Sequence, residues 1–161
     1  AFFTVYAVKS LLMDNLTIGI MTAVLMITQV IANPLLGRIA DKWSRKWVLV
    51  FGGMAAVISS LLAVIIKSPT LFSLVFILDG VAVTCFWTIG LAISLEFGDD
   101  SSRPTYVGMA NTLVSPATFF APLVGGFLAD SFGYPVTFIT SAIIGTIAIV
   151  TLTILVKDPS S

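Results

Sequence analysis

Five apolar runs, each long enough to cross a lipid bilayer, constrain how this chain can fold. They cover approximately residues 16–40, 47–66, 71–95, 105–129 and 135–156. An α-helix rises about 1.5 Å per residue, so about 20 residues span the hydrocarbon core. A helix also satisfies its backbone hydrogen bonds within one segment, which lipid requires. The runs therefore predict an all-α, polytopic membrane helix bundle.

The composition fits a membrane protein and excludes several other classes. Of 161 residues, 58% are hydrophobic and 10% are charged, whereas soluble domains carry roughly a quarter charged residues. Eight basic residues balance eight acidic ones, so no positive excess points to a nucleic acid. Histidine is absent and Cys85 is the single cysteine, which excludes Ser/His or Cys/His catalytic pairs and an internal disulfide. We therefore expect no enzyme, no cofactor, no metal site and no nucleic-acid partner.

Basic residues gather on one side of the predicted bundle. When alternate turns are taken together, one side receives Arg38, Lys42, Arg45, Lys46, Arg103 and Lys157, and the other receives Lys9 and Lys67. Turns on the cytoplasmic side of a membrane are enriched in lysine and arginine. This distribution predicts that the turn at residues 41–46 and the C-terminus lie in the cytoplasm.

The segment "GRIADKWSRK", residues 37–46, resembles the signature of the major facilitator superfamily, G-x-L-A-D-[RK]-x-G-[RK]-[RK]. In that family the signature lies in the cytoplasmic turn between the second and third helices of each half. Ser44 stands where the family usually has glycine, although serine can cap the following helix. The positions that match the motif are Gly37, Asp41, Lys42, Arg45 and Lys46.

This resemblance implies a secondary active transporter that carries a small solute by alternating access. It also implies that Asp41 engages the N-terminus of a helix in the other half of the transporter. Lys42, Arg45 and Lys46 would hold anionic membrane lipid or acidic partners. The substrate does not follow from the resemblance, because one fold serves many substrates.

An internal repeat supports the same architecture. The segment "PLLGRIAD" at residues 34–41 recurs, with one insertion, as "PLVGGFLAD" at residues 122–130. An odd number of membrane crossings separates the copies, so they should end on opposite sides of the membrane. This is the arrangement of inverted three-helix repeats. The second copy is followed by "SFGY", which has no basic residue, as expected outside the cell.

Residues 103–138 resemble the last loop and last two helices of bacterial permeases in this superfamily. The chain is therefore interpreted as the C-terminal transmembrane half of a twelve-helix fold in a bacterial or archaeal inner membrane. Residues 1–12 would end the seventh helix, and the five runs would form helices eight to twelve. The partner would be the missing N-terminal six-helix half of the same chain.

Two alternatives remain open at this point. The chain could be the N-terminal half of a drug/proton antiporter, since "APLVGG" resembles the fifth-helix pattern G-x-x-x-G-P-x-x-G-G, with Ala121 in place of one glycine. It could also belong to a non-transporting membrane subunit or sensor that keeps the fold.

Polar stripes on two runs are candidate walls of an aqueous cavity. The run at residues 16–40 carries Thr22, Gln29 and Asn33, and the run at residues 105–129 carries Asn111, Ser115 and Thr118. A hydrogen bond between helices explains any one of them more simply, but the matched pair of stripes favours a cavity wall. Four residues of the run at residues 105–129 would loosen its helix and permit the bending that alternating access needs, namely Pro116, Pro122, Gly125 and Gly126.

Asp79 is the candidate proton-coupling residue. It lies near the middle of the run at residues 71–95, where a charged carboxylate costs about 3 kcal/mol on insertion scales. Such a group must face a partner or a cavity, or carry a proton. The simpler alternative is that Asp79 packs against the turn at Gly80 or a hydroxyl group and only stabilises the bundle.

Overall fold

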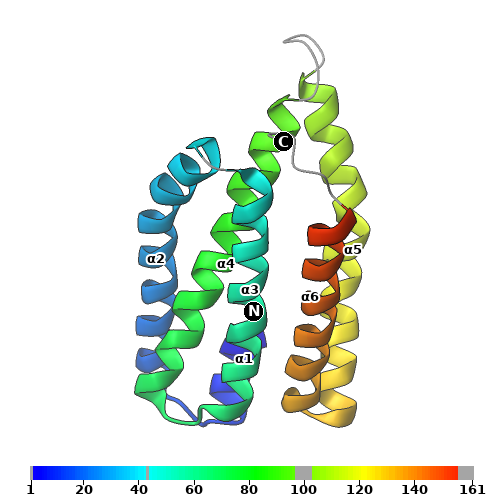
Figure 1. Cartoon of the computed structure of the whole chain (residues 1–161). Coiled ribbons are helices and arrows are strands. Elements are labelled where there is room, and N and C mark those ends of the chain that lie inside the picture. The colour runs from blue at the N-terminus through cyan, green and yellow to red at the C-terminus, as the bar shows by residue number, and fades with distance from the viewer. Residues whose placement is uncertain (1, 43, 97–102, 156–161) are drawn as a thin grey trace.

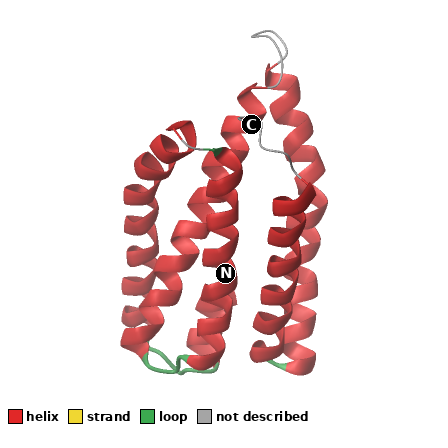
Figure 2. Ribbon diagram, in the orientation of Figure 1, coloured by secondary structure: helices red, strands yellow, loops and turns green. Residues whose placement is uncertain are grey.

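The computed structural model describes residues 2–42, 44–96 and 103–155. Within these ranges the chain forms helices joined by short loops (Figures 1 and 2). The helices are α1 (Phe2–Lys9), α2 (Asn15–Lys42), α3 (Arg45–Ile65), α4 (Pro69–Glu96), α5 (Arg103–Phe132) and α6 (Tyr134–Leu155). Five of them, α2 to α6, are long and apolar enough to cross a membrane. The predicted all-α membrane bundle is confirmed, and the ends of α2 to α6 fall within three residues of the predicted runs.

Consecutive long helices run in opposite directions (Figure 1). We call the end where α2 stops and α3 starts the motif end, and the end where α3 stops and α4 starts the opposite end. α2 ends at the motif end and α5 ends at the opposite end, so the two repeat copies terminate on opposite faces, as predicted. The helices α1–α3 and α4–α6 thus form two three-helix units of opposite direction.

The distribution of basic residues over the two ends also follows the prediction within the described part. Arg38 and Lys42 lie on the last turns of α2, and Arg45 and Lys46 lie on the first turn of α3. Lys9 and Lys67 lie at the opposite end. Lys157 falls outside the described residues.

Helix α3 packs between α4 and α6 through adjacent glycines. A Cβ atom added to Gly52 would overlap Cβ of Cys85 on α4, and one added to Gly53 would lie 2.8 Å from Cγ1 of Ile149 on α6. Across the same contact, a Cβ on Gly145 of α6 would lie 2.8 Å from Cγ2 of Val57. Small residues let membrane helices approach closely, which compensates for the weak hydrophobic drive between them. The two glycines therefore let α3 of the first three-helix unit pack closely against α4 and α6 of the second.

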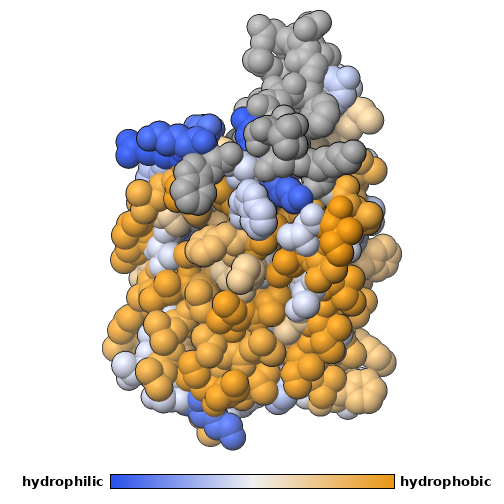
Figure 3. All heavy atoms as spheres, in the orientation of Figure 1, coloured by the Kyte–Doolittle hydropathy of each residue, from blue (hydrophilic) through white to orange (hydrophobic). Residues whose placement is uncertain are grey.

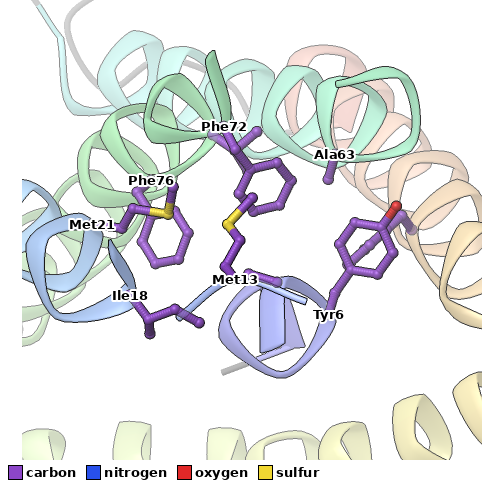
Figure 4. Packing of buried hydrophobic residues seen from close by; sticks show 10 residues of the cluster. Tyr6, Met13, Ile18, Met21, Ala63, Phe72 and Phe76 are labelled. Atoms are coloured by element: carbon purple, nitrogen blue, oxygen red, sulfur yellow. The ribbon is translucent and has the colours of Figure 1, made fainter. Parts of the chain in front are cut away.

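An aromatic cluster holds the opposite end together (Figure 4). Tyr6 of α1 packs against Phe72 of α4 and against Tyr134 and Phe138 of α6, with ring centroids 5.2–5.9 Å apart. Met13, in the turn after α1, belongs to the same cluster and points toward Phe72 in Figure 4. Aromatic pairs at these distances contribute beyond their buried area. The short helix α1 is thereby fixed to the bundle.

A second apolar cluster lies nearer the motif end and joins α2, α3 and α4. Its buried residues are Ala32, Leu36, Ala40, Val48, Cys85 and Ile89. The middle of α4 therefore lies between two apolar layers.

The start of α2 is stabilised by Asp14, which stands directly before it. Thr17 donates a hydrogen bond from Oγ1 to the Asp14 carboxylate, and this bond holds the pKa of Asp14 below its usual value. A carboxylate also interacts favourably with the positive end of the helix dipole. Because the folded-state pKa is lowered, this stabilisation is present at neutral pH and is lost as the pH falls through that lowered value.

Candidate functional site

The signature loop lies at the motif end, where α2 passes into α3. Asp41 and Lys42 occupy the last turn of α2 and are exposed. Ser44 takes the N-cap position of α3 with an extended backbone, φ −174°, but makes no side-chain capping bond. Ser44 therefore occupies the N-cap position, but its hydroxyl does not cap the helix.

Lys46 has a partner inside the bundle. Its Nζ donates a hydrogen bond of 2.9 Å to the backbone carbonyl of Thr153, in the last turn of α6. The last four carbonyls of a helix have no partner within the helix, and a cation there also favours the helix dipole. Lys46 therefore ties the start of α3 to the end of α6. The sequence contains no signal for this contact, because the acceptor is a backbone atom 107 residues away.

We expect Lys46→Met to lower the free energy of unfolding by about 1–3 kcal/mol, the range for loss of a charged hydrogen-bond partner. Methionine keeps an unbranched chain of similar length, so the change removes mainly the charge and the donor. Reversible unfolding in mixed micelles measures the effect. Lys67→Met is the matched control, since Lys67 is exposed in the turn between α3 and α4. Equal stabilities of the two variants would contradict the tie.

Asp79 is half-buried on α4, between the two apolar clusters. Phe76, one turn before it, belongs to the aromatic cluster, and Cys85, further along α4, belongs to the second cluster. Among the described residues no hydrogen bond or ion pair reaches its carboxylate.

The groups near Asp79 that could have been its packing partners, Gly80 and neighbouring hydroxyls, make other contacts. A Cβ added to Gly80 would lie 3.1 Å from the carbonyl oxygen of Leu25, so Gly80 is the point where α4 approaches α2. The hydroxyl of Thr84 donates to the Gly80 carbonyl at 2.8 Å, and that of Thr28 donates to the carbonyl of Val24. Neither Gly80 nor these two hydroxyls therefore serves as a hydrogen-bond partner of the Asp79 carboxylate.

The polar stripe on α2 is divided between internal and interhelical hydrogen bonds. Thr22 is half-buried and its hydroxyl donates to the carbonyl of Ile18. Gln29 is also half-buried. Asn33 is exposed and accepts a 2.7 Å hydrogen bond at Oδ1 from the hydroxyl of Thr88 on α4. Asn33 therefore links two helices, which a pattern within α2 alone could not reveal.

The stripe on α5 is exposed along its length. Asn111, Ser115 and Thr118 are all exposed. The hydroxyl of Ser115 donates to the carbonyl of Asn111, and that of Thr118 donates to the carbonyl of Ser115. α2 and α5 lie at opposite edges of the bundle (Figure 1), so the structure does not bring the two stripes together within this chain.

Helix α5 continues through both of its prolines. Pro116 and Pro122 lie inside the helix, and each leaves one backbone carbonyl without its usual donor. Gly125 packs closely against the Phe2 ring of α1, because a Cβ atom added there would lie 2.7 Å from Cζ of that ring. A Cβ on Gly126 would meet nothing within 4 Å. Of this glycine pair, therefore, only Gly125 is required by packing in this structure.

A protein family matches the whole chain, and several known proteins match most of it. The sequence model of the Major Facilitator Superfamily matches residues 1–161. Multidrug resistance protein MdtL of Shewanella sp. (strain ANA-3) is 28% identical over 109 residues, which is 68% of this chain and 28% of that protein. Multidrug resistance protein 2 of Bacillus subtilis (strain 168) is 26% identical over 153 residues, 95% of this chain and 38% of that protein. The staphyloferrin B transporter of Staphylococcus aureus (strain NCTC 8325 / PS 47) is 29% identical over 133 residues, which is 83% of this chain and 30% of that protein.

The chain spans about a third of the length of the curated relatives it matches. Its membrane-length helices and its relatives together identify an integral membrane protein. The helix order, with two three-helix units of opposite direction, fits one half of the family's bundle. On the match over all 161 residues, the chain belongs to the major facilitator superfamily.

Proposed function

We propose that the protein is a secondary transporter that moves a small solute across the membrane by alternating access, driven by a proton gradient. In this proposal the chain is the C-terminal half, its motif end lies in the cytoplasm, and the N-terminal six-helix half completes the cavity. The membrane is the inner membrane of a bacterium or archaeon. The excess of basic residues at the motif end supports this orientation.

The observation that carries the proposal is the half-buried carboxylate of Asp79 at mid-depth of α4, without a hydrogen-bond or ion-pair partner in the described residues. An intramembrane carboxylate is costly and usually functional. A group that alternately takes up and releases a proton needs this freedom from a permanent counter-ion. Asp79 is therefore assigned as the proton carrier.

The polar stripes on α2 and α5 are assigned to the cavity wall. Both helices lie at the edges of the bundle, and their exposed polar residues need a surface other than lipid. Asn111, Ser115 and Thr118 would then face the second half of the transporter across the solute path. The residues Pro116, Pro122, Gly125 and Gly126 let α5 bend as the cavity opens to either side.

The names of the relatives guide the choice of test solutes. Two are named multidrug resistance proteins and one a staphyloferrin B transporter, so drug-like organic compounds are tried first. Full-length protein in proteoliposomes should move such a solute only when a pH gradient is imposed, and a protonophore should stop the movement. Folded protein that moves none of a broad panel, with or without the gradient, would favour the sensor or subunit alternative.

The exposed carboxylate of Asp41 is proposed to bind the N-terminus of a helix in the other half, which holds the cytoplasmic side closed. Such a contact contributes about 0.3–1 kcal/mol, so Asp41→Asn should shift the balance between inward-open and outward-open states by up to about fivefold toward inward-open. Labelling of cavity cysteines from each side reports this balance. Asp130→Asn, in the repeat copy at the opposite end, is the control. Equal labelling of wild type and Asp41→Asn would contradict the latch.

A further inference from the structure

The hydrogen bond between α2 and α4 fixes the orientation of one side-chain amide. The hydroxyl of Thr88 donates to Oδ1 of Asn33 at 2.7 Å. An asparagine amide has an acceptor oxygen on one side and a nitrogen with two donors on the other, so this bond turns the Asn33 nitrogen away from Thr88. Among the described residues the Asn33 side chain makes no further hydrogen bond. Its two N–H groups are therefore left to bind another partner.

A hydrogen-bond acceptor lies one turn earlier on the same helix. Pro34 lies inside α2 and has no N–H, so the backbone carbonyl of Val30 lacks its usual donor. Val30 precedes Asn33 by three residues, a spacing that puts both on one side of the helix. Both residues are exposed, Val30 by 73%. This side of α2 thus offers donors and an acceptor within one helical turn.

The depth of this polar group is unusual. Asn33 lies nine residues before the end of α2 at Lys42, which is about 13 Å along the helix. Figure 3 shows a face that is apolar along most of its height, with hydrophilic atoms gathered at the ends. A backbone or amide group without a partner is costly in hydrocarbon. This side of α2 should therefore face water or a polar ligand rather than acyl chains.

Trp87 adds an aromatic surface at the same level. It directly precedes Thr88 on α4 and is 74% exposed. It follows Gly80, the point where α4 approaches α2, by seven residues, so it lies on the same side of α4 two turns further on. Figure 1 shows α2 and α4 running beside each other. The indole ring is therefore available to stack on an aromatic group of a ligand.

We propose that Asn33, Val30 and Trp87 form a binding site for a solute that carries a carboxamide beside an aromatic ring. The N–H groups of Asn33 donate to the carboxamide oxygen, the Val30 carbonyl accepts from the carboxamide N–H, and the ring stacks on Trp87. Thr88 is a positioning residue, because its hydroxyl holds the Asn33 amide in the orientation that presents the donors. The inference rests on the proposed transport function, for which it names the solute class.

Equilibrium dialysis of the full-length protein in lipid nanodiscs tests the site, with binding to empty nanodiscs subtracted. The two probes are naphthalene-2-carboxamide and 2-ethylnaphthalene, which has the same rings and no hydrogen-bonding group. Asn33→Leu should weaken binding of the carboxamide about three- to tenfold, the equivalent of one or two hydrogen bonds, and leave the hydrocarbon unchanged. Asn15→Leu, at the exposed start of α2, is the matched control and should change neither.

Two further positions separate orientation of the amide from stacking. Thr88→Val should weaken the carboxamide about two- to fivefold, and Thr88→Ser, which keeps the hydroxyl, should restore wild-type binding. Trp87→Leu should weaken both probes about threefold, because both contain the ring. The contact of Gly80 with Leu25 remains in all these variants, so α2 and α4 should stay packed.

Thiol labelling tests whether Asn33 faces water. In a background without other cysteines, Asn33→Cys should react about tenfold faster than Ile31→Cys with a charged methanethiosulfonate, since the reactive thiolate forms in water. Ile31 is the matched control because it is 57% exposed on the other side of α2. Naphthalene-2-carboxamide should slow the labelling of Asn33→Cys.

Three results would overturn the site: equal loss of both probes in Asn33→Leu, wild-type carboxamide binding in that variant, or labelling of Asn33→Cys no faster than that of Ile31→Cys. Proton-coupled transport of other solutes with no preference for the carboxamide would overturn this inference and leave the proposed function intact. Carboxamide binding that depends on Asn33, without transport of any solute, would support the site and overturn the proposed function.

Discussion

Replacing Gly52 with leucine is expected to leave little folded protein. The first atom of any side chain at this position would overlap Cβ of Cys85, which is completely buried on α4. A Cβ atom cannot rotate away, so α3 and α4 would have to separate. Since α3 also packs on α6 through Gly53, the displacement would open two helix contacts at once. Overpacking of this kind costs about 1–3 kcal/mol and more when the backbone must move.

The yield of monodisperse protein and its thermal unfolding in detergent measure this effect. Gly19→Leu is the matched control, because a Cβ at Gly19 of α2 would meet nothing within 4 Å. Gly52→Ala should lose less stability than Gly52→Leu. Adding Cys85→Gly to Gly52→Ala should restore much of the lost stability, because it removes the overlapping Cβ atom. If Gly52→Leu gave the same yield and melting temperature as the wild type, α3 and α4 would not meet as described.

Asp79→Asn is expected to abolish solute accumulation driven by a pH gradient, with a loss of at least tenfold. Asparagine keeps the size and polarity of the side chain but cannot release a proton, so the coupling step is removed and the packing is kept. Solute-for-solute exchange without a gradient should survive, because it needs only the movement between the two open states. Accumulation and exchange in proteoliposomes give the two readings.

Thermal unfolding of the Asp79→Asn variant distinguishes coupling from packing. Wild-type stability with lost accumulation supports the role as proton carrier. Lost accumulation together with lost stability would assign Asp79 to the bundle instead. Accumulation at the wild-type level would exclude Asp79 as the carrier.

The spans and their directions could be predicted because bilayer thickness determines how long an apolar run must be. The ends differ by up to three residues since helices continue into polar turns, as α2 does through Asp41 and Lys42. The opposite placement of the two repeat copies followed from counting crossings. These features depend on local composition, which a single sequence contains.

The contacts between helices could not be predicted in the same way. Gly52 and Gly53 resemble any glycine pair in a membrane helix, and nothing in the sequence shows that one meets Cys85 and the other Ile149. The Asn33–Thr88 hydrogen bond joins residues 55 positions apart. The stripes on α2 and α5 were recognised from their periodicity, but their places at opposite edges depend on how the helices pack.

Counting protons against solute molecules in the same proteoliposomes tests the central proposal most directly. A pH-sensitive dye inside the vesicles and a labelled solute would be followed together in wild-type protein with no imposed gradient. Proton-coupled transport predicts that addition of solute moves protons in a fixed ratio and that Asp79→Asn removes the proton movement. Solute movement with no accompanying change in internal pH would contradict it.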